Sequence, residues 1–318
     1  MLDNIQNLGK KKSEESVYDD YNIEIKNPIH ELTNDDLEIS CLCILNDGRL
    51  VSGFYDNSII IYNKTTYQPD LIIKEHKNAI TCIVQLSSGM LASCSEDKTI
   101  KLFNIKGIKY EIIQSLNYHK KEVHKIIELK NTNLVSCSED SSIIFYFKDN
   151  NEYKMDYKIS LDDICTSIIQ TKDNEICYPQ DKEKKIYFFD LLKRKIKTSI
   201  SRKNEFKGIC ECFIMIRKDL LLITGEYQMS IINTDKYEIV RKIDVPGADD
   251  ISAVCMLNKN MILTGDSEGI LRQWKMEGDN LILFSKKEKT HDASIIALLN
   301  IGNGFIASGF EDGTIKIW

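Results

Sequence analysis

Histidine, serine and aspartate residues occur in three sets that share one spacing. The sets are His76/Ser93/Asp97, His119/Ser136/Asp140 and His291/Ser308/Asp312, and 17 residues separate the histidine from the serine in each. A histidine beside a serine and an aspartate is the arrangement of a serine hydrolase, in which the histidine accepts the proton of the nucleophilic hydroxyl. An enzyme needs one such triad. The recurrence of the set at a fixed spacing therefore indicates a structural role.

Other patterns that carry chemistry are missing from the sequence. It contains no G-x-x-x-x-G-K-[ST], no G-x-S-x-G and no H-E-x-x-H. The ten cysteines form no C-x-x-C pair, and none has a histidine at metal-ligand spacing. Of the five histidines only His30 and His124 lie outside the three sets. We therefore expect a non-catalytic protein that holds no metal and no cofactor.

Composition is typical of a soluble globular protein. The chain has 318 residues, 28% charged and 42% hydrophobic, and its net charge of −6 argues against indiscriminate binding of nucleic acid. No apolar run approaches the roughly 18 residues of a membrane span. The first residues lack the apolar core of a signal peptide. We expect a cytoplasmic protein with reduced, mostly buried cysteines, with the nucleus as the alternative compartment.

An internal repeat predicts the architecture. The segments VSGFYDNSIIIYN, ASCSEDKTIKLFN, VSCSEDSSIIFYF and ASGFEDGTIKIW are variants of one another, and weaker copies fill the intervals between them. Their final positions are Tyr62, Phe103, Tyr146, Phe189, Ile232, Trp274 and Trp318, at successive gaps of 41, 43, 43, 43, 42 and 44 residues. This is the period of about 40–45 residues of a four-stranded propeller blade. Apolar residues alternate within each copy, as in strands, so we predict an all-β fold.

The copies resemble the WD-repeat family over roughly residues 21–318. That family places a histidine before the first strand, a serine or threonine in the second, an aspartate in the turn and a tryptophan in the third. The last repeat has all four, as His291, Ser308, Asp312 and Trp318. The resemblance implies a seven-bladed β-propeller. Repeats four and five depart from the pattern, because Pro179 stands at the serine position and Ile232 replaces the tryptophan.

The shared spacing predicts a buried polar relay. The aspartate accepts a hydrogen bond from the histidine, the serine hydroxyl continues the chain, and an indole N–H closes it. Where Phe103 replaces the tryptophan, only a triad remains. We assign this structural role to His76, Ser93, Asp97, His119, Ser136, Asp140, His291, Ser308, Asp312 and Trp318.

One propeller domain is expected over residues 18–318, after a disordered tail at 1–17. The repeats span approximately 36–75, 76–118, 119–160, 161–205, 206–247, 248–290 and 291–318. The last repeat ends at Trp318, after its third strand. Residues 18–30 include the alternating segment YNIEI, so we expect them to supply its outer strand and close the ring.

Two surface features suggest binding. In similar propellers the residue before the turn acid lies on the narrow face, around a central channel; here these residues are Tyr55, Glu96, Glu139, Ser267 and Glu311. Further acids precede the first strands of several repeats, namely Asp36, Glu38, Asp163, Asp249, Asp250 and Asp292. An acidic rim favours a basic peptide. We therefore expect a scaffold or adaptor subunit of a larger complex that binds proteins or peptides on this face.

The second feature is basic. Residues 182–207 carry ten lysines and arginines against three acids, a local net charge of +7. The candidate patch is Lys182, Lys184, Lys185, Lys193, Arg194, Lys195, Arg202 and Lys203. Its charge suits an acidic protein, RNA or an anionic membrane. The alternative function is therefore an RNA- or membrane-associated propeller that acts through the basic edge of blade four, although aromatic residues arranged to stack on bases are not evident.

Overall fold

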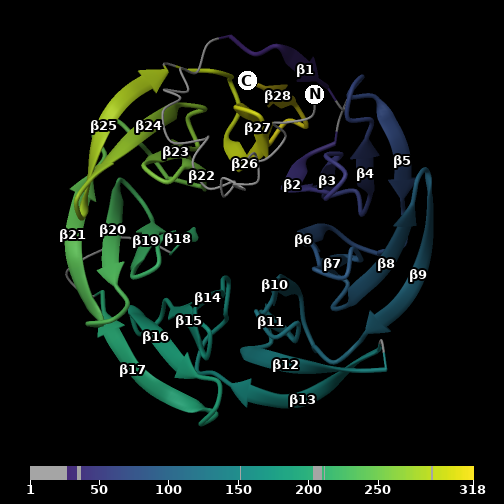
Figure 1. The fold of residues 1–318 in the computed structure, drawn as a ribbon, viewed down its shortest axis with the longest axis horizontal. Coiled ribbons are helices and arrows are strands. Elements are labelled where there is room, and N and C mark those ends of the chain that lie inside the picture. The colour runs from purple at the N-terminus through teal and green to yellow at the C-terminus, as the bar shows by residue number, and fades with distance from the viewer. Residues whose placement is uncertain (1–26, 34–36, 151, 203–209, 211, 288) are drawn as a thin grey trace, which may run out of the picture.

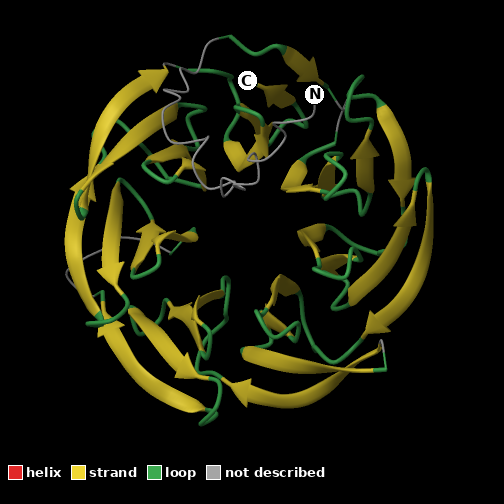
Figure 2. Cartoon of the chain, viewed as in Figure 1, coloured by secondary structure: helices red, strands yellow, loops and turns green. Residues whose placement is uncertain are grey.

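Seven four-stranded antiparallel sheets form a ring (Figure 1). The computed structural model describes residues 27–33, 37–150, 152–202, 210, 212–287 and 289–318. Within these ranges the regular structure is all strand, with no helix (Figure 2). The chain passes from sheet to sheet in order, and each sheet is one blade of a β-propeller. The all-β fold with seven blades is therefore confirmed.

Each blade runs from an inner to an outer strand. Blade one consists of β2 (Ile39–Ile44), β3 (Leu50–Phe54), β4 (Ile59–Tyr62) and β5 (Pro69–Ile73). Blade two consists of β6 (Ile80–Gln85), β7 (Leu91–Ser95), β8 (Ile100–Lys106) and β9 (Lys109–Leu116). Blade three consists of β10 (Val123–Glu128), β11 (Leu134–Ser138), β12 (Ser142–Asp149) and β13 (Glu152–Ser160). Blade four consists of β14 (Ile169–Lys172), β15 (Glu175–Gln180), β16 (Lys185–Asp190) and β17 (Lys195–Ser201). Blade five consists of β18 (Phe213–Arg217), β19 (Leu220–Thr224), β20 (Gln228–Asn233) and β21 (Glu238–Asp244). Blade six is β22 (Ala253–Asn258), β23 (Met261–Gly265), β24 (Leu271–Glu277) and β25 (Asn280–Lys287), and blade seven is β26 (Ile295–Gly302), β27 (Phe305–Phe310), β28 (Ile315–Ile317) and β1 (His30–Leu32).

The turn between the second and third strands explains the acidic motif. In blade two the Asp97 carboxylate accepts the backbone N–H of Thr99 at 3.0 Å, and Lys98 between them has a left-handed φ of 75°. In blade six this left-handed position is occupied by Gly269, where an added Cβ would lie 2.4 Å from the His291 carbonyl oxygen. The position after the turn acid thus requires a residue that tolerates positive φ, and in blade two the aspartate before it accepts a backbone N–H of the turn.

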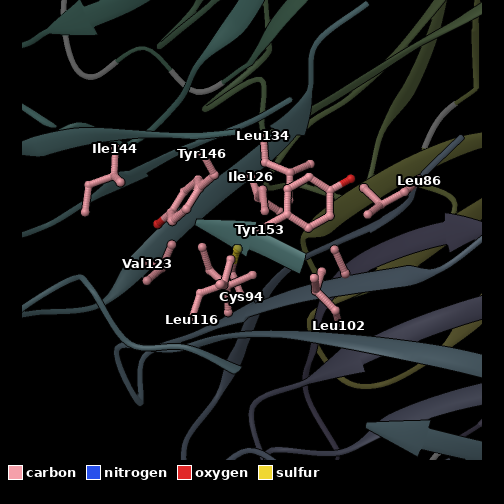
Figure 3. Packing of buried hydrophobic residues seen from close by; sticks show 12 residues of the cluster. Leu86, Cys94, Leu102, Leu116, Val123, Ile126, Leu134, Ile144, Tyr146 and Tyr153 are labelled. Carbon is pink, nitrogen blue, oxygen red and sulfur yellow. The ribbon is translucent and has the colours of Figure 1, made fainter. Parts of the chain in front are cut away.

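The hydrophobic core is divided into layers between successive blades. One cluster joins blades two and three and includes Leu102, Leu116, Ile126 and Leu134, all at most 2% exposed (Figure 3). Equivalent clusters occupy the other blade interfaces. Burial of these side chains is the main force that holds the ring together, at about 25 cal/mol per Å² of apolar surface.

The ring closes where β1 pairs with β28, so that the sheet of blade seven contains both ends of the described chain. His30 is opposite Ile317 and Leu32 is opposite Ile315, and the Ile29 N–H donates to the Ile317 carbonyl at 2.7 Å. The outer strand of this blade is therefore His30–Leu32. The YNIEI segment and the tail at 1–17, for which the sequence predicts a strand and disorder, lie outside the described residues.

Blades four and five correct one detail of the predicted alignment. Strand pairing places Tyr178 opposite Tyr187, two residues before Phe189, so Tyr178 and not Pro179 occupies the serine position. In blade five Ile223 occupies this position, opposite Ser230. The turn of blade four is one residue longer than in blade two, which explains why simple spacing misplaced it. Both residues are buried, and these two blades replace the relay with apolar packing.

Candidate functional site

Blade three contains the most complete polar relay. The Nδ1 atom of His119 lies 3.2 Å from the Asp140 carboxylate, and its Nε2 lies 2.7 Å from the Ser136 hydroxyl. The hydroxyl of Tyr146 then lies 3.0 Å from Ser136 Oγ. A tyrosine thus closes the network in place of the family's tryptophan. Burial lowers the pKa of His119 in spite of the opposing effect of Asp140, so the folded state favours the neutral imidazole.

Blade two has the predicted triad without the final donor. His76 Nδ1 lies 2.9 Å from Asp97 and its Nε2 lies 2.7 Å from Ser93 Oγ. Phe103 has no polar group in its side chain and therefore cannot extend the hydrogen-bonded relay. Burial alone would raise the pKa of Asp97, but hydrogen bonds from His76, Thr99 and the Lys77 backbone N–H hold it well below its usual range.

Blade seven differs from the prediction. The His291 Nε2 atom lies 2.6 Å from Asp312, and Trp318 Nε1 donates to Ser308 at 2.8 Å, but the described residues show no hydrogen bond between His291 and Ser308. The relay is divided into two pairs because the imidazole uses Nε2 for the carboxylate and packs against the Phe310 ring, 4.6 Å away. The repeat with the full set of motif residues is therefore not the one with the full network.

The burial of the relay side chains, like their repetition, indicates a structural role. The side chains of His76 and Asp97 are 1% and 5% exposed, and those of His119 and Asp140 are 1% and 4% exposed. A substrate cannot reach the histidine without opening the blade. The described residues contain no group of three or more histidine, cysteine or acidic side chains placed to hold a metal.

Rim residues are held in place by one repeated backbone bond. The N–H groups of Tyr55, Glu96, Glu139, Ser267 and Glu311 each donate at 3.0 Å to a carbonyl just before the first strand of the same blade, namely those of Glu38, Ala79, Glu122, Asp250 and Ser294. The two partners are 17 residues apart in every case. This spacing identifies Glu122 as a rim neighbour that sequence reasoning missed. We call the face that carries these turns the narrow face.

Carboxylates from neighbouring blades gather around Tyr55 on the narrow face. We call Glu38, Glu96, Glu122, Glu139 and Glu311 the acidic arc. Tyr55 is 53% exposed, and burial together with the charges of Glu96, Glu38 and Glu311 raises the pKa of its hydroxyl. Burial and the charge of Glu122 likewise raise the pKa of Glu96. A bound cation would lower the electrostatic repulsion between these carboxylates.

Other predicted acids are placed differently. The Asp163 carboxylate accepts the Lys182 backbone N–H at 2.8 Å, and Asp292 pairs with Lys289 at 2.8 Å. Asp249 accepts the N–H of Tyr227 through its carbonyl, a bond that joins the turn of blade five to the entry of blade six. Asp36 lies outside the described residues. Lys121 lies 3.8 Å from Glu139 and weakens the arc at blade three.

The predicted basic patch is not one surface. Lys182, Lys184 and Lys185 lie at the turn before β16, whereas Lys193, Arg194 and Lys195 lie at the turn after it. The pairing of Lys185 with Ser201 and of Asp190 with Lys195 places the two groups at opposite ends of the strand. Arg202 is 1% exposed and forms an ion pair with Asp181, so it contributes no surface charge. Lys203 lies outside the described residues.

Several of these cations are already neutralised. Lys185 pairs with Glu183 at 2.6 Å, and Arg194 pairs with Asp156 at 2.7 Å. Adjacency in the sequence overestimated the patch because successive turns of a blade point to opposite faces of the ring. We call the face opposite the narrow face, which carries the turn after β16, the wide face.

The fold and its repeated motif define the class of the protein as a seven-bladed β-propeller. A family model described as "WD domain, G-beta repeat" matches residues 26–63, 67–104 and 285–318. Three segments of this propeller thus match WD40 repeats, and they centre on blades one, two and seven. No curated protein matches the chain.

WD40 propellers are typically non-catalytic, and this architecture suggests a protein-interaction scaffold. In the described ranges no helix is long and apolar enough to cross a membrane.

Proposed function

We propose that this protein is an interaction scaffold that captures a basic peptide segment on its narrow face, as an adaptor subunit of a larger assembly. The observation that carries the proposal is the position of Tyr55 among carboxylates that come from blades seven, one and two. A lysine or arginine side chain placed there would relieve the repulsion within the acidic arc. Its aliphatic or planar part would also contact the exposed tyrosine ring.

The backbone supports this role. Because each of the five rim N–H groups is bonded to the same blade's first-strand entry, the rim side chains extend from turns whose backbone is already fixed before a peptide binds. All ten cysteines lack disulfides, which supports the further proposal that the protein works in a reducing compartment such as the cytoplasm.

Charge reversal tests the proposal. The triple variant E96K/E139K/E311K and wild type would be titrated with fluorescein-labelled peptides rich in arginine and lysine, and binding followed by fluorescence anisotropy. We expect the affinity to fall more than about tenfold, because each reversal replaces attraction by repulsion at the contact. Wild-type binding should also weaken as salt is added.

A matched control separates the site from net charge. The variant E111K/E152K/E238K changes the same number of charges on the outer strands, where Glu111 and Glu238 are well exposed. It should bind like wild type. Unchanged binding by the narrow-face variant, or equal loss in both variants with unchanged melting temperatures, contradicts the proposal.

A further inference from the structure

The outer strand of blade six, β25, exposes three successive apolar side chains. Ile282, Leu283 and Phe284 are 44%, 46% and 47% exposed. The strand lies on the circumference of the ring, at the edge of its sheet, and among the described residues it pairs only with β24 (Figure 1). An apolar edge strand is a template for association with another chain. We call Ile282–Phe284 the apolar edge.

A bulge explains why these three neighbours are exposed together. Leu283 is opposite Trp274 of β24, and Ser285 is opposite Gln273, so Phe284 has no residue opposite it. In a regular strand successive side chains point to opposite faces, but the extra residue of a bulge breaks this alternation. Successive side chains of β25 can therefore lie outside the core.

Two other blades place a charged residue at the bulge of the outer strand. The unpaired residue is Asp156 in blade three and Lys197 in blade four. Asp156 forms an ion pair with Arg194 at 2.7 Å, and Lys197 forms one with Glu175 at 3.0 Å. Charged side chains on an edge strand oppose its pairing with another chain. Blade six has Phe284 at this position and lacks that protection.

Blade two exposes a similar apolar pair but holds it against the next blade. Ile112 and Ile113 of β9 are 40% and 38% exposed. Beside them the Gln114 side chain donates to the Tyr153 carbonyl at 2.7 Å and accepts the Tyr153 N–H at 2.8 Å, which joins β9 to the outer strand of blade three. Ser285 has the position of Gln114 in blade six, but it donates to β24 of its own blade at 2.5 Å. Among the described residues β25 thus has no bond of this kind to blade seven.

The beginning of β25 is acidic. Glu277, at the turn before the strand, is exposed and forms no ion pair with any residue that the structure describes. Asp279 in the same turn pairs with Arg217 of blade five at 2.7 Å. Lys275 of β24 is opposite Ile282, on the side of β25 that is away from its free edge. Glu277 is therefore the charge that this end offers to a partner.

The other end of β25 is basic. Lys286 is exposed, and the Lys287 ammonium lies 4.7 Å from the centre of the Trp318 ring. Burial and the charge of nearby Lys316 lower the pKa of Lys287. A carboxylate brought to this end by a partner would reduce the repulsion between the two ammonium groups.

This order of charges makes β25 complementary to a second copy of itself that runs antiparallel. The acidic beginning of each strand then faces the basic end of the other, and the two apolar edges meet between them. We infer that the outer edge of blade six binds a second copy of this chain in this antiparallel arrangement. Both copies use the same patch, so the contact closes at a dimer. Side chains make the contact, because the bulge at Phe284 interrupts the backbone ladder.

Sedimentation velocity of the full chain tests the inference. One strand from each copy buries little surface, and small interfaces give weak pairs, so the series should span roughly 1–100 µM protein. We expect the sedimentation coefficient of wild type to rise with concentration toward that of a dimer. L283S/F284S should raise the dissociation constant by about tenfold or more, because it removes the apolar contact. The matched variant I112S/I113S on β9, with equally exposed apolar residues, should associate as wild type does. All four positions are exposed, so the melting temperatures should not change.

A charge exchange tests the antiparallel direction. E277K and K287E each bring like charges together at both ends of the contact, so each should weaken the dimer about tenfold. E277K/K287E restores opposite charges across the contact and should recover association, which unspecific apolar adhesion does not predict. Should loss of the Trp318 contact lower the melting temperature of K287E, K286E at the exposed neighbour takes its place.

A wild-type chain that stays monomeric throughout the series, or that grows beyond a dimer, overturns the inference. Association that L283S/F284S retains overturns it too, as does a double exchange that fails to recover what the single reversals lose. The narrow-face variant E96K/E139K/E311K should still dimerise, and L283S/F284S should still bind basic peptides. The two proposals therefore succeed or fail separately.

Discussion

Blades two and three and blades four and five reach the same geometry with different polar groups. In the first pair a buried histidine joins the blade entry to the second strand and the turn, as His119 does through Ser136 and Asp140. In the second pair Tyr178 and Ile223 fill the serine position, and the buried charge lies at the wide-face end, at Glu175. The comparison teaches that alternating apolar residues are sufficient to build the blade, while the relay adds stability at one end of it.

Removing the carboxylate of the blade-three relay should have the largest effect. Asp140→Ala leaves His119, whose side chain is 1% exposed, without its partner and removes the acceptor for the Lys120 N–H. We expect the free energy of unfolding to fall by about 3 kcal/mol, because several hydrogen bonds to a charged, buried carboxylate are lost together, measured by urea denaturation. The exposed control Asp173→Ala should leave the urea midpoint close to that of wild type, because an exposed ion pair is screened by solvent. Equal losses of unfolding free energy in the two variants would show that the relay carboxylate contributes no more to stability than an exposed carboxylate does.

Acid should act on blades two and three before blades four and five. Interactions in the folded protein depress the pKa values of Asp97 and Asp140, so their stabilising contribution is full above the unfolded pKa of about 3.9 and is lost as the pH falls further. The lowered pKa of His119 adds a loss that begins below about pH 6.5.

Hydrogen exchange measured peptide by peptide between pH 7 and 3, with rates corrected for intrinsic chemistry, would test this order. Amides of β7 and β11 should lose protection by a larger factor than those of β15 and β19. In D97N and D140N the acid-dependent part of the loss should shrink in the altered blade. Uniform loss of protection around the ring contradicts the expected difference.

The buried acid of blade four should be less costly to remove. Glu175→Ala leaves Lys197 and Lys172, whose side chains are 44% and 30% exposed and can be solvated. We expect a loss of about 1–2 kcal/mol, mainly from the hydrogen bonds of Thr171 and Tyr237. The urea midpoint of this variant, compared with that of Asp140→Ala, measures the difference between the two kinds of blade. If Glu175→Ala lowered the free energy of unfolding as much as Asp140→Ala does, the expected difference between the two kinds of blade would be contradicted.

A reciprocal pair gives the smallest expected change. Phe103→Tyr places a hydroxyl where Tyr146 has one, within reach of Ser93, and should stabilise blade two by about 1 kcal/mol. Tyr146→Phe should destabilise blade three by a similar amount, since it removes the bond of 3.0 Å to Ser136. Thermal denaturation of both variants tests the pair, and a loss in both would mean that the pocket around Phe103 has no room for the oxygen.

Much of the fold follows from local patterns. The spacing of the terminal residues from Tyr62 to Trp318 predicts seven blades, because a repeated strand pattern leaves few alternatives once its period is known. The relay partners of His76 and His119 also follow from spacing, because a regular blade brings positions 17 residues apart together.

The remaining features depend on geometry that spacing does not contain. One extra turn residue shifted the register at Tyr178, and a reversed imidazole separated His291 from Ser308. The predicted basic residues fall into two separate groups because consecutive turns of a blade lie on opposite faces of the ring. This arrangement is clear only when the strand pairing is known. The apolar edge Ile282–Phe284 has no signal in the sequence either, because an apolar run in a strand is typical of a buried one until the pairing reveals the bulge.

The backbone bonds beneath the rim have a consequence for how such proteins diversify. Each rim N–H is satisfied by a carbonyl at 3.0 Å whether the side chain is tyrosine, glutamate or serine. Substitution at Tyr55, Glu96 or Ser267 therefore changes what the face recognises while the turn beneath it stays the same. A lineage can exchange one partner for another by a few point mutations, without passing through a misfolded intermediate.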